Sequence, residues 1–259
     1  MKKFLRVCLR PLKSLLEGVA QIEASLAARW AAAAHRRLFF VQWRLPPQPE
    51  HFDHRIDLYY QWPVKRQSFW LERGVYGSLA LQPGCTLLEL ACGDGFNARH
   101  FYSLRCCEVV ACDFDPRALA TARRKNRAPN VTYLLADIRT AMPAGQFDNI
   151  AWDAAIEHFT PVEIAGLMRD IRARLKPGGV LSGYTIVEQA TGVKSLSHHE
   201  YEFKNKEDLL RFLTPHFANV TVFETVHPTR HNLYFWASDG VLPFAPDWAH
   251  ACRQRRGGS

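Results

Sequence analysis

Leu87-Leu-Glu-Leu-Ala-Cys-Gly-Asp-Gly-Phe-Asn-Ala-Arg-His-Phe101 is the stretch that decides the fold of this chain. The leucines around Glu89 form an apolar run that follows a Pro-Gly turn signal, and such a run predicts a buried strand. Gly93 and Gly95 come next, and glycine permits positive φ and a close approach of the backbone to a ligand. A helix over residues 96–104 would point its first N–H groups at this turn. The order strand, glycine turn, helix is typical of a nucleotide-type cofactor site.

Two ligands compete for this turn. Gly93, Gly95 and Ala98 satisfy the dinucleotide pattern G-x-G-x-x-G/A. Glu89, however, lies inside the strand four positions before the first glycine, and a carboxylate there would repel a pyrophosphate. S-adenosylmethionine (SAM) carries no phosphate, and its ammonium is attracted to a carboxylate. The charge pattern therefore favours SAM, with S-adenosylhomocysteine (SAH) as the product, over a dinucleotide or a turn without a ligand.

Strands and helices alternate after this turn, which predicts a parallel α/β sheet. The hairpin at the end, with six residues from His227 to Asn232 between its strands, favours antiparallel pairing. A helix is expected over 161–175 and a turn over 176–179. The expected strands are 86–91, 108–113, 131–135, 147–152, 180–186, 220–226 and 233–237.

Acidic residues follow the second and third predicted strands. Asp113 ends the second strand, where a carboxylate can accept hydrogen bonds from both hydroxyls of a ribose. Asp115 is predicted to cap the next helix. Phe114 is expected to pack on adenine. After the third strand, Asp137 is expected to accept a hydrogen bond from the adenine amino group while Ile138 packs on the ring.

Residues 83–238 resemble a class I SAM-dependent methyltransferase domain. Residues 89–95 resemble its first motif, with Ala91 where a third glycine is common. The resemblance extends through motifs at 111–116, 136–137, 147–158 and 175–179. It implies a Rossmann-like α/β sheet, mostly parallel with an antiparallel last strand, and transfer of a methyl group from SAM. Cofactor contacts are expected at Glu89, Ala91, Gly93, Gly95, Asp113, Phe114, Asp137, Ile138 and Trp152.

A finer likeness is to bacterial methyltransferases found among surface-polysaccharide genes. It rests on residues 69–74, 157–159, 198–200 and 228–235. This likeness implies a sugar or glycan hydroxyl as the methyl acceptor, in a polysaccharide biosynthesis pathway. A methyltransferase for a membrane lipid or quinone and a non-catalytic SAM-binding scaffold are the alternatives.

Methyl transfer to a hydroxyl is an in-line SN2 reaction that also needs a base. Asp153, His158 and His199 are the candidate catalytic residues, because they follow the fourth and fifth predicted strands, and His198 is a candidate substrate contact. His158 would otherwise orient the helix after the fourth strand. Asp153 and the histidines could instead hold a divalent metal, but nothing in their spacing requires it and no metal is expected.

The positive charge of the chain is concentrated at its ends. Residues 1–45 hold nine Lys and Arg against two Glu, whereas the body is slightly acidic, which argues against nucleic acid as a partner. Apolar residues recur at helical spacing from Leu12 to Ala33, which predicts an amphipathic helix. This helical extension would pack on its own domain, form a homodimer, or lie on an anionic membrane surface.

Leu45-Pro-Pro-Gln-Pro-Glu50 is a stiff linker that begins an aromatic-rich segment, 46–82. It is expected to form a lid whose Tyr59 and Tyr60 bind substrate, or to pack on the sheet edge. The methyltransferase domain would then span 83–240, with a tail over 241–259. No signal peptide or membrane span is expected, and the seven cysteines are expected to be free thiols. These features favour the cytoplasm, with peripheral contact at the inner membrane face.

Overall fold

The computed structural model describes residues 2–49, 51–189 and 194–242. It divides into two compact units, 1–70 and 71–259. Residues 243–259, which make up most of the predicted tail, lie outside the described residues, as do residues 190–193.

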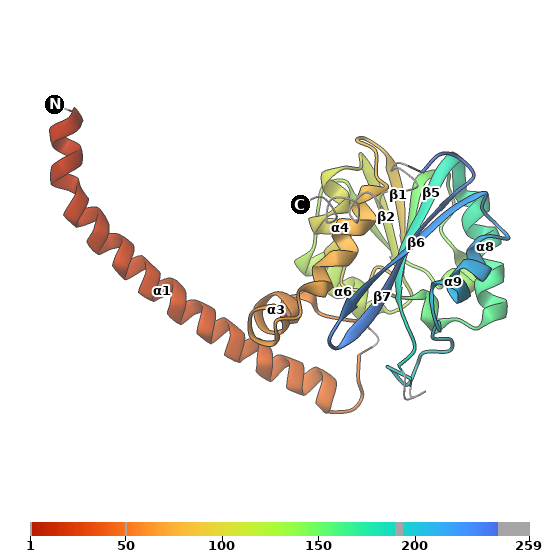
Figure 1. Ribbon diagram of the computed structural model, residues 1–259, viewed down its shortest axis with the longest axis horizontal. Coiled ribbons are helices and arrows are strands. Elements are labelled where there is room, and N and C mark those ends of the chain that lie inside the picture. The colour runs from red at the N-terminus through yellow and green to blue at the C-terminus, as the bar shows by residue number, and fades with distance from the viewer. Residues whose placement is uncertain (1, 50, 190–193, 243–259) are drawn as a thin grey trace, which may run out of the picture. The chain divides into compact units, whose positions relative to one another are not determined.

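The second unit is built on a seven-stranded sheet with the order β3-β2-β1-β4-β5-β7-β6 (Figure 1). The first five strands pair in parallel, and β7 pairs antiparallel with both β5 and β6. This topology confirms the predicted Rossmann-like methyltransferase sheet. The strands are β1 (Thr86–Leu90), β2 (Glu108–Asp113), β3 (Val131–Leu135), β4 (Phe147–Asp153), β5 (Leu175–Ile186), β6 (Asn219–His227) and β7 (Arg230–Ser238).

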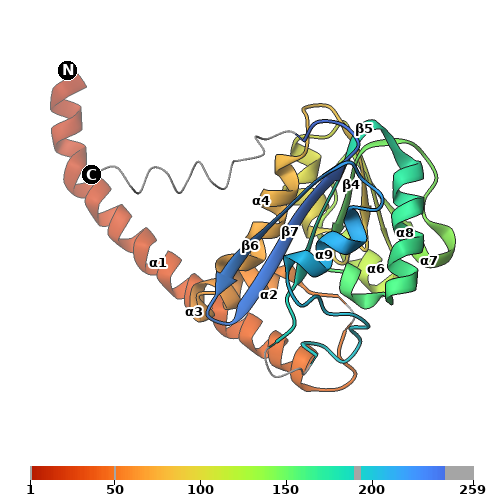
Figure 2. The ribbon, with the colours of Figure 1, turned by 45° about the vertical axis from the view of Figure 1, so that its right-hand side comes forward.

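Helices cover both faces of this sheet, and Figure 2 shows α4 and α8 on opposite sides of it. Asp115 caps α6, and Thr160 and Glu163 form a capping box at α8. The α-helices are α4 (Glu72–Leu79), α5 (Phe96–His100), α6 (Pro116–Lys125), α7 (Ile138–Ala141), α8 (Pro161–Arg174) and α9 (Lys206–Leu213), and the 3₁₀-helices are η3 (Tyr102–Leu104) and η4 (Ile156–His158).

The alternation of side chains along β1 assigns its residues to two separate cores. Leu87 packs with residues of α5 and α6, including Ala98 and Leu119. Leu88 and Leu90 pack on the opposite face, in the larger core that includes residues of α8 and α9. Because every second residue of a strand points to the same face, helices on both sides require a strand that is apolar throughout. Glu89 is the exception to this pattern.

Several predicted boundaries differ from the structure. The hairpin loop is only Pro228-Thr229, because β6 continues through His227 and β7 begins at Arg230. Residues 176–179 belong to β5 rather than to a separate turn, and the pairing of β5 with β4 is irregular there. Lys176 ties this segment to β4 through an ion pair of 3.0 Å with Asp148. The predicted helix over 96–104 is an α-helix followed by a 3₁₀ turn, and α9 has no counterpart among the predicted elements.

The first unit begins with α1 (Lys2–Arg44), which confirms the predicted N-terminal helix. Tyr59 and Tyr60 pack against its carboxyl-terminal half, with ring centroids 4.8 Å from His35 and 5.7 Å from Phe39. The short elements that follow are α2 (His54–Ile56), the π-helical turn η1 (Asp57–Gln61), α3 (Trp62–Lys65) and the 3₁₀-helix η2 (Ser68–Leu71). The part of α1 before His35 exposes the apolar residues Leu12, Leu15, Leu16, Val19, Ile22, Leu26 and Trp30.

Among the described residues, no helix is both long and apolar enough to cross a bilayer.

Two glycines give a matched test of this packing. A Cβ at Gly183 of β5 would lie 2.2 Å from the carbonyl oxygen of Trp152 and 2.3 Å from the Phe235 ring. We expect Gly183→Ala to lower the free energy of unfolding by about 3 kcal/mol or more, since a backbone atom must move. A Cβ at Gly166 of α8 would meet only the Arg169 guanidinium at 3.8 Å. Gly166→Ala should raise the free energy of unfolding by about 0.5–1 kcal/mol, since alanine favours a helix more than glycine does. Urea denaturation measures both, and equal effects would contradict the packing described.

Candidate functional site

The turn after β1 has an unusual backbone. Ala91, Gly93 and Gly95 all have positive φ, at 54°, 55° and 72°. A Cβ at Gly95 would lie 2.4 Å from the hydroxyl oxygen of Tyr133, so a side chain has no room there. Ala91 is also left-handed, although it carries a Cβ, and it occupies the position where a third glycine is common in the motif that this turn resembles. The turn brings its main chain, not side chains, to the carboxyl edge of the sheet, where ligands of such sheets bind.

Asp113 connects this turn to the end of β2. Its Oδ2 accepts a hydrogen bond from the N–H of Gly93 at 2.8 Å, and its Oδ1 accepts one from the N–H of Asp115 at 2.9 Å. The side chain is buried at the carboxyl end of the strand. A carboxylate has further lone pairs, so the same group can bind the turn and accept from a ribose diol. That contact with ribose stays a prediction.

Glu89 is a buried acid beneath the turn. It is 2% exposed, and within the described part of the chain its Oε2 has no hydrogen-bond partner. Burial raises the pKa of Glu89 well above its ordinary value, and the carboxylates of Asp153 and Asp94 raise it further, while Arg73 lowers it. Such a group gains from a cation placed beside it. Contact between Glu89 and the ammonium of SAM stays a prediction.

Asp153 lies at the end of β4, on the side of the glycine turn. Its Oδ2 accepts a hydrogen bond from the Asn97 amide at 2.8 Å and lies 3.8 Å from Nε of Arg73 in α4. The Arg73 guanidinium also sits 5.6 Å from the centre of the Tyr184 ring. Asp153 therefore takes part in a network that joins α4, α5 and β5. Sequence patterns gave no role to Arg73, whose importance is visible only in three dimensions.

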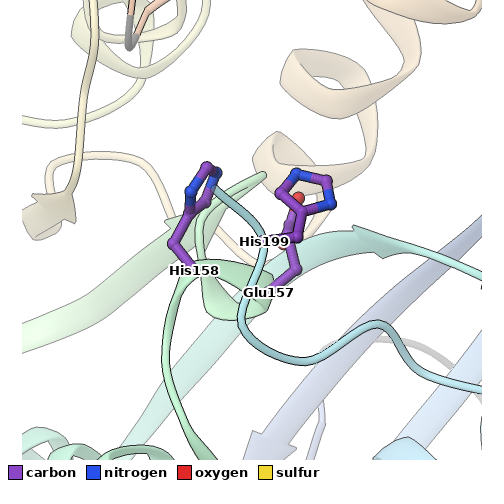
Figure 3. A group of neighbouring side chains, drawn as sticks. All are labelled: Glu157, His158 and His199. Atoms are coloured by element: carbon purple, nitrogen blue, oxygen red, sulfur yellow. The ribbon is translucent and has the colours of Figure 1, made fainter. Parts of the chain in front are cut away.

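The three predicted histidines gather in one place, together with Glu157. Ligand atoms of Glu157, His158 and His199 lie within 4.8 Å of one another (Figure 3). The rings of His158 and His198 stack at 4.9 Å, and His199 meets His158 edge-on at 4.8 Å. The first two residues of this group end η4, and the histidines at 198–199 come from the loop after β5. Asp153 is not a member of the group.

His199 is held by a residue that the sequence analysis did not single out. Its Nδ1 lies 2.5 Å from Oε1 of Glu202, and both side chains are buried. Burial lowers the pKa of His199, although the nearby Glu157 and Glu202 act in the opposite direction. A spacing of three in a loop does not by itself pair two side chains, so the sequence carried no signal for this contact.

The remaining predicted cofactor residues have varied surroundings. Asp137 caps α7 and forms an ion pair of 2.8 Å with Arg139, which lowers the pKa of Asp137 through their hydrogen bond. Phe114 is 51% exposed, whereas Ile138 is buried. The Trp152 side chain is fully buried in the core, 5.5 Å from the Phe159 ring. Their contacts with the cofactor stay predictions.

Comparison with known proteins agrees with this geometry. Residues 87–179 match the family described as methyltransferase domain. The matched residues run from β1 to the start of β5, so this part of the chain is a methyltransferase domain. The chain is 31% identical over 107 residues to an uncharacterized methyltransferase of Synechocystis sp., and 35% identical over 132 residues to the ribosomal protein L11 methyltransferase of Burkholderia multivorans. These matches cover 40% and 49% of this chain. They span only 49% and 39% of the two relatives, so less than half of either protein is matched.

Solved structures show the same fold for the methyltransferase domain. The complex of DhpI with SAH has a TM-score of 0.54 at 22% identity, covering 68% of this chain and 89% of that one. The N-methyltransferase NodS from Bradyrhizobium japonicum has a TM-score of 0.56 at 18% identity, covering 69% of this chain and all of that one. At these identities the likeness concerns the fold alone. SAM is the cofactor that this domain class uses.

Substitutions in the glycine turn test the cofactor site. Asp113→Ala removes the acceptor of the Gly93 and Asp115 N–H groups, and we expect it to weaken SAH binding at least tenfold, or by about 1.4 kcal/mol or more. Gly93→Val should abolish binding, because a branched residue is strained at positive φ. Isothermal titration with SAH measures both. Asp170→Ala, at an exposed carboxylate of α8, is the control, and wild-type affinity in all three variants would contradict the assignment.

Proposed function

We propose that this protein is a cytoplasmic SAM-dependent methyltransferase that methylates a hydroxyl of a sugar or glycan acceptor. The observation that carries the proposal is the convergence of Glu157 and the three histidines beyond the ends of β4 and β5. Imidazole is the side chain whose ordinary pKa suits proton transfer near neutral pH. A hydroxyl acceptor must lose its proton during methyl transfer, and an imidazole can accept that proton.

The reaction is balanced without another reactant. The acceptor oxygen attacks the sulfonium methyl group, the new C–O bond forms as the C–S bond breaks, and the bonding pair goes to sulfur to leave SAH. The hydroxyl proton passes to an imidazole. Alignment of the oxygen with the methyl group supplies much of the acceleration, and the base adds to it.

His158 is the histidine that best suits the role of base. Nδ1 of His199 is already engaged by Glu202, and burial lowers the pKa of His199. His158 is only half-buried, and its ring stacks on His198. We therefore assign proton acceptance to His158 and contact with the acceptor to His198. Asp153, bound by Asn97 and near Arg73, fits better as a positioning residue for the wall of the cofactor site.

The sugar-type acceptor rests on the resemblance to methyltransferases encoded among surface-polysaccharide genes. The segments that carry this resemblance include 157–159 and 198–200. Glu157, His158, His198 and His199 from these segments lie together in the fold. Tyr59 and Tyr60 belong to the first unit, and their proposed contact with the acceptor rests on their aromatic character alone.

Replacing the proposed base separates catalysis from binding. His158→Ala should leave SAH affinity unchanged and lower the turnover of a glycan acceptor by about 10²–10⁴-fold, the usual contribution of a general base. Transfer from methyl-labelled SAM into a water-soluble glycan fraction measures turnover. His216→Ala, at the carboxyl end of α9, is the matched control. Undiminished turnover in His158→Ala would return that residue to a structural role, and SAH binding without turnover on any extract would favour a scaffold.

A second candidate is methylation of a membrane lipid or quinone. It is favoured by α1, whose exposed apolar residues share the helix with Arg10, Lys13 and Arg29. Apolar and basic side chains together allow a helix to lie in the interface of an anionic bilayer. The same surface would suit a homodimer, in which the apolar residues of two copies of α1 cover each other.

Added charge on α1 tests its membrane contact. Leu15→Glu with Ile22→Glu should abolish co-sedimentation with phosphatidylglycerol-containing vesicles, because each carboxylate opposes insertion and is repelled by the anionic surface. Gln21→Glu adds a charge at a helical position away from the apolar row and should retain most of the binding. If the wild type does not sediment with the vesicles, the lipid candidate loses its support. Light scattering then decides whether the apolar row forms a dimer.

A further inference from the structure

Glu157, His158 and His199 supply one carboxylate and two imidazoles at a single point (Figure 3). Their ligand atoms come from two segments, η4 and the loop after β5. Glu157 and His199 are each only 3% exposed. This donor set, two nitrogens and one oxygen, is one that first-row transition metals prefer, whereas Mg²⁺ and Ca²⁺ prefer oxygen ligands alone.

Each buried member of the group is already oriented by a neighbour. Oε1 of Glu202 contacts Nδ1 of His199, which leaves Nε2 as the atom directed to a metal. Metal-binding histidines usually make this contact with a carboxylate through their second nitrogen. The hydroxyl of Thr185 donates to Oε2 of Glu157 at 3.0 Å, in the way that ligating carboxylates are held.

The loop that carries His199 is also fixed to the other segment. The main-chain oxygen of Glu157 accepts hydrogen bonds from the N–H groups of Glu200 and Tyr201, at 2.9 and 3.0 Å. The N–H of Ser195 donates to Glu202 at 2.6 Å. Residues more than 40 positions apart are thus held together by the backbone, so the three ligands do not depend on a chance arrangement of side chains.

The charge of the region is consistent with a bound cation. The carboxylates of Glu157 and Glu202 are both largely buried. Glu202 contacts the His199 imidazole, and Glu157 lies beside the same ring. Buried carboxylates are stable when they are paired with cations or bind metals. Oε2 of Glu202 is buried and has no hydrogen-bond partner in the described part of the chain.

We infer that Glu157, His158 and His199 bind one divalent transition-metal ion, with Glu202 and Thr185 as the residues that orient the ligands. Metal–ligand distances of about 2.0–2.2 Å allow two ligands to be at most about 4.4 Å apart, slightly less than the 4.8 Å limit found here. A rotation of the half-buried His158 side chain closes this difference. Three protein ligands leave coordination positions for a substrate.

The role of this ion rests on the proposed function. A hydroxyl of the acceptor would occupy an open coordination position, and the positive charge would lower the pKa of that hydroxyl, as it does for metal-bound water. With the ion bound, the hydroxyl proton passes to water instead of to an imidazole, and the C–O bond forms as the C–S bond breaks, as in the reaction above. His158 acts in this case as a ligand rather than as the base.

Metal binding can be measured without an acceptor. The full-length protein, stripped of metal with a chelator and free of a histidine tag, is titrated with Mn²⁺ followed by electron paramagnetic resonance and with Zn²⁺ followed by calorimetry. We expect one ion per chain. Glu157→Gln and His199→Ala should weaken binding by at least tenfold, and Glu202→Gln by about 10–100-fold, the usual effect of losing a residue that orients a ligand. SAH affinity, measured on the same samples, should be unchanged and shows that each variant is folded.

His231→Ala is the matched control, because His231 also pairs with a carboxylate, Glu224, at 2.7 Å, but on the exposed hairpin and outside the group. It should bind metal as the wild type does. Absence of binding to the wild type, or equal losses in His231→Ala and His199→Ala, overturns the site. The failure of the proposed function is a different result: metal and SAH bind, but no methyl group reaches any acceptor.

Discussion

The carboxylate of Glu89 beneath a turn of left-handed residues is the constraint on which the rest of the site depends. A buried acid in a strand that is otherwise apolar costs free energy unless a cation compensates it. Glu89 belongs to β1, which lies between β2 and β4, where the order of the sheet reverses. Ligands of such sheets bind at this reversal, so the unfavourable residue is located where a ligand can relieve it.

Several further acidic residues surround the turn above Glu89. Besides burial, the carboxylates of Asp153, Asp94 and Asp113 raise the pKa of Glu89, whereas the Arg73 guanidinium lowers it. A phosphate placed on this turn would face several carboxylates, although the turn has the backbone of a phosphate-binding loop. A sulfonium amino acid nucleoside would instead bring an ammonium and a positively charged sulfur to them. The electrostatics therefore distinguish two ligands that the glycine pattern alone does not.

Much of this could be predicted from the sequence because the signals are local. β1 and the glycine turn are adjacent in the chain, and their structure follows from an apolar run and two glycines. The antiparallel hairpin was predicted for the same reason, but its loop was predicted too long because His227 and Arg230–Asn232 were interpreted as loop residues. Polar residues continue a strand when a partner strand supplies their hydrogen bonds, and all of them pair in β6 and β7.

The contacts that the sequence did not indicate are those between distant segments. Arg73 and Asp153 are 80 positions apart, and nothing in either neighbourhood predicts their approach. The interpretation of Asp153 as a possible base failed to include this partner. Glu202 was likewise invisible, since its spacing from His199 has meaning only when both side chains turn inward. Pairings of this kind depend on tertiary packing, which propensity and periodicity do not encode.

The topology finally explains why the two chemical parts can work together. The turn that suits the cofactor follows β1, whereas the group of histidines follows β4 and β5, and β1 and β4 are neighbours in the sheet. Parallel strands end at the same edge, so residues after each of them project to one side. Arg73 contacts both sides of this region: its Nε lies 3.8 Å from Oδ2 of Asp153, and its guanidinium carbon lies 5.6 Å from the centre of the Tyr184 ring. Tyr184 directly precedes Thr185, whose hydroxyl holds Glu157. A short series of residues thus connects Asp153, at the end of β4, with the carboxylate of the histidine group.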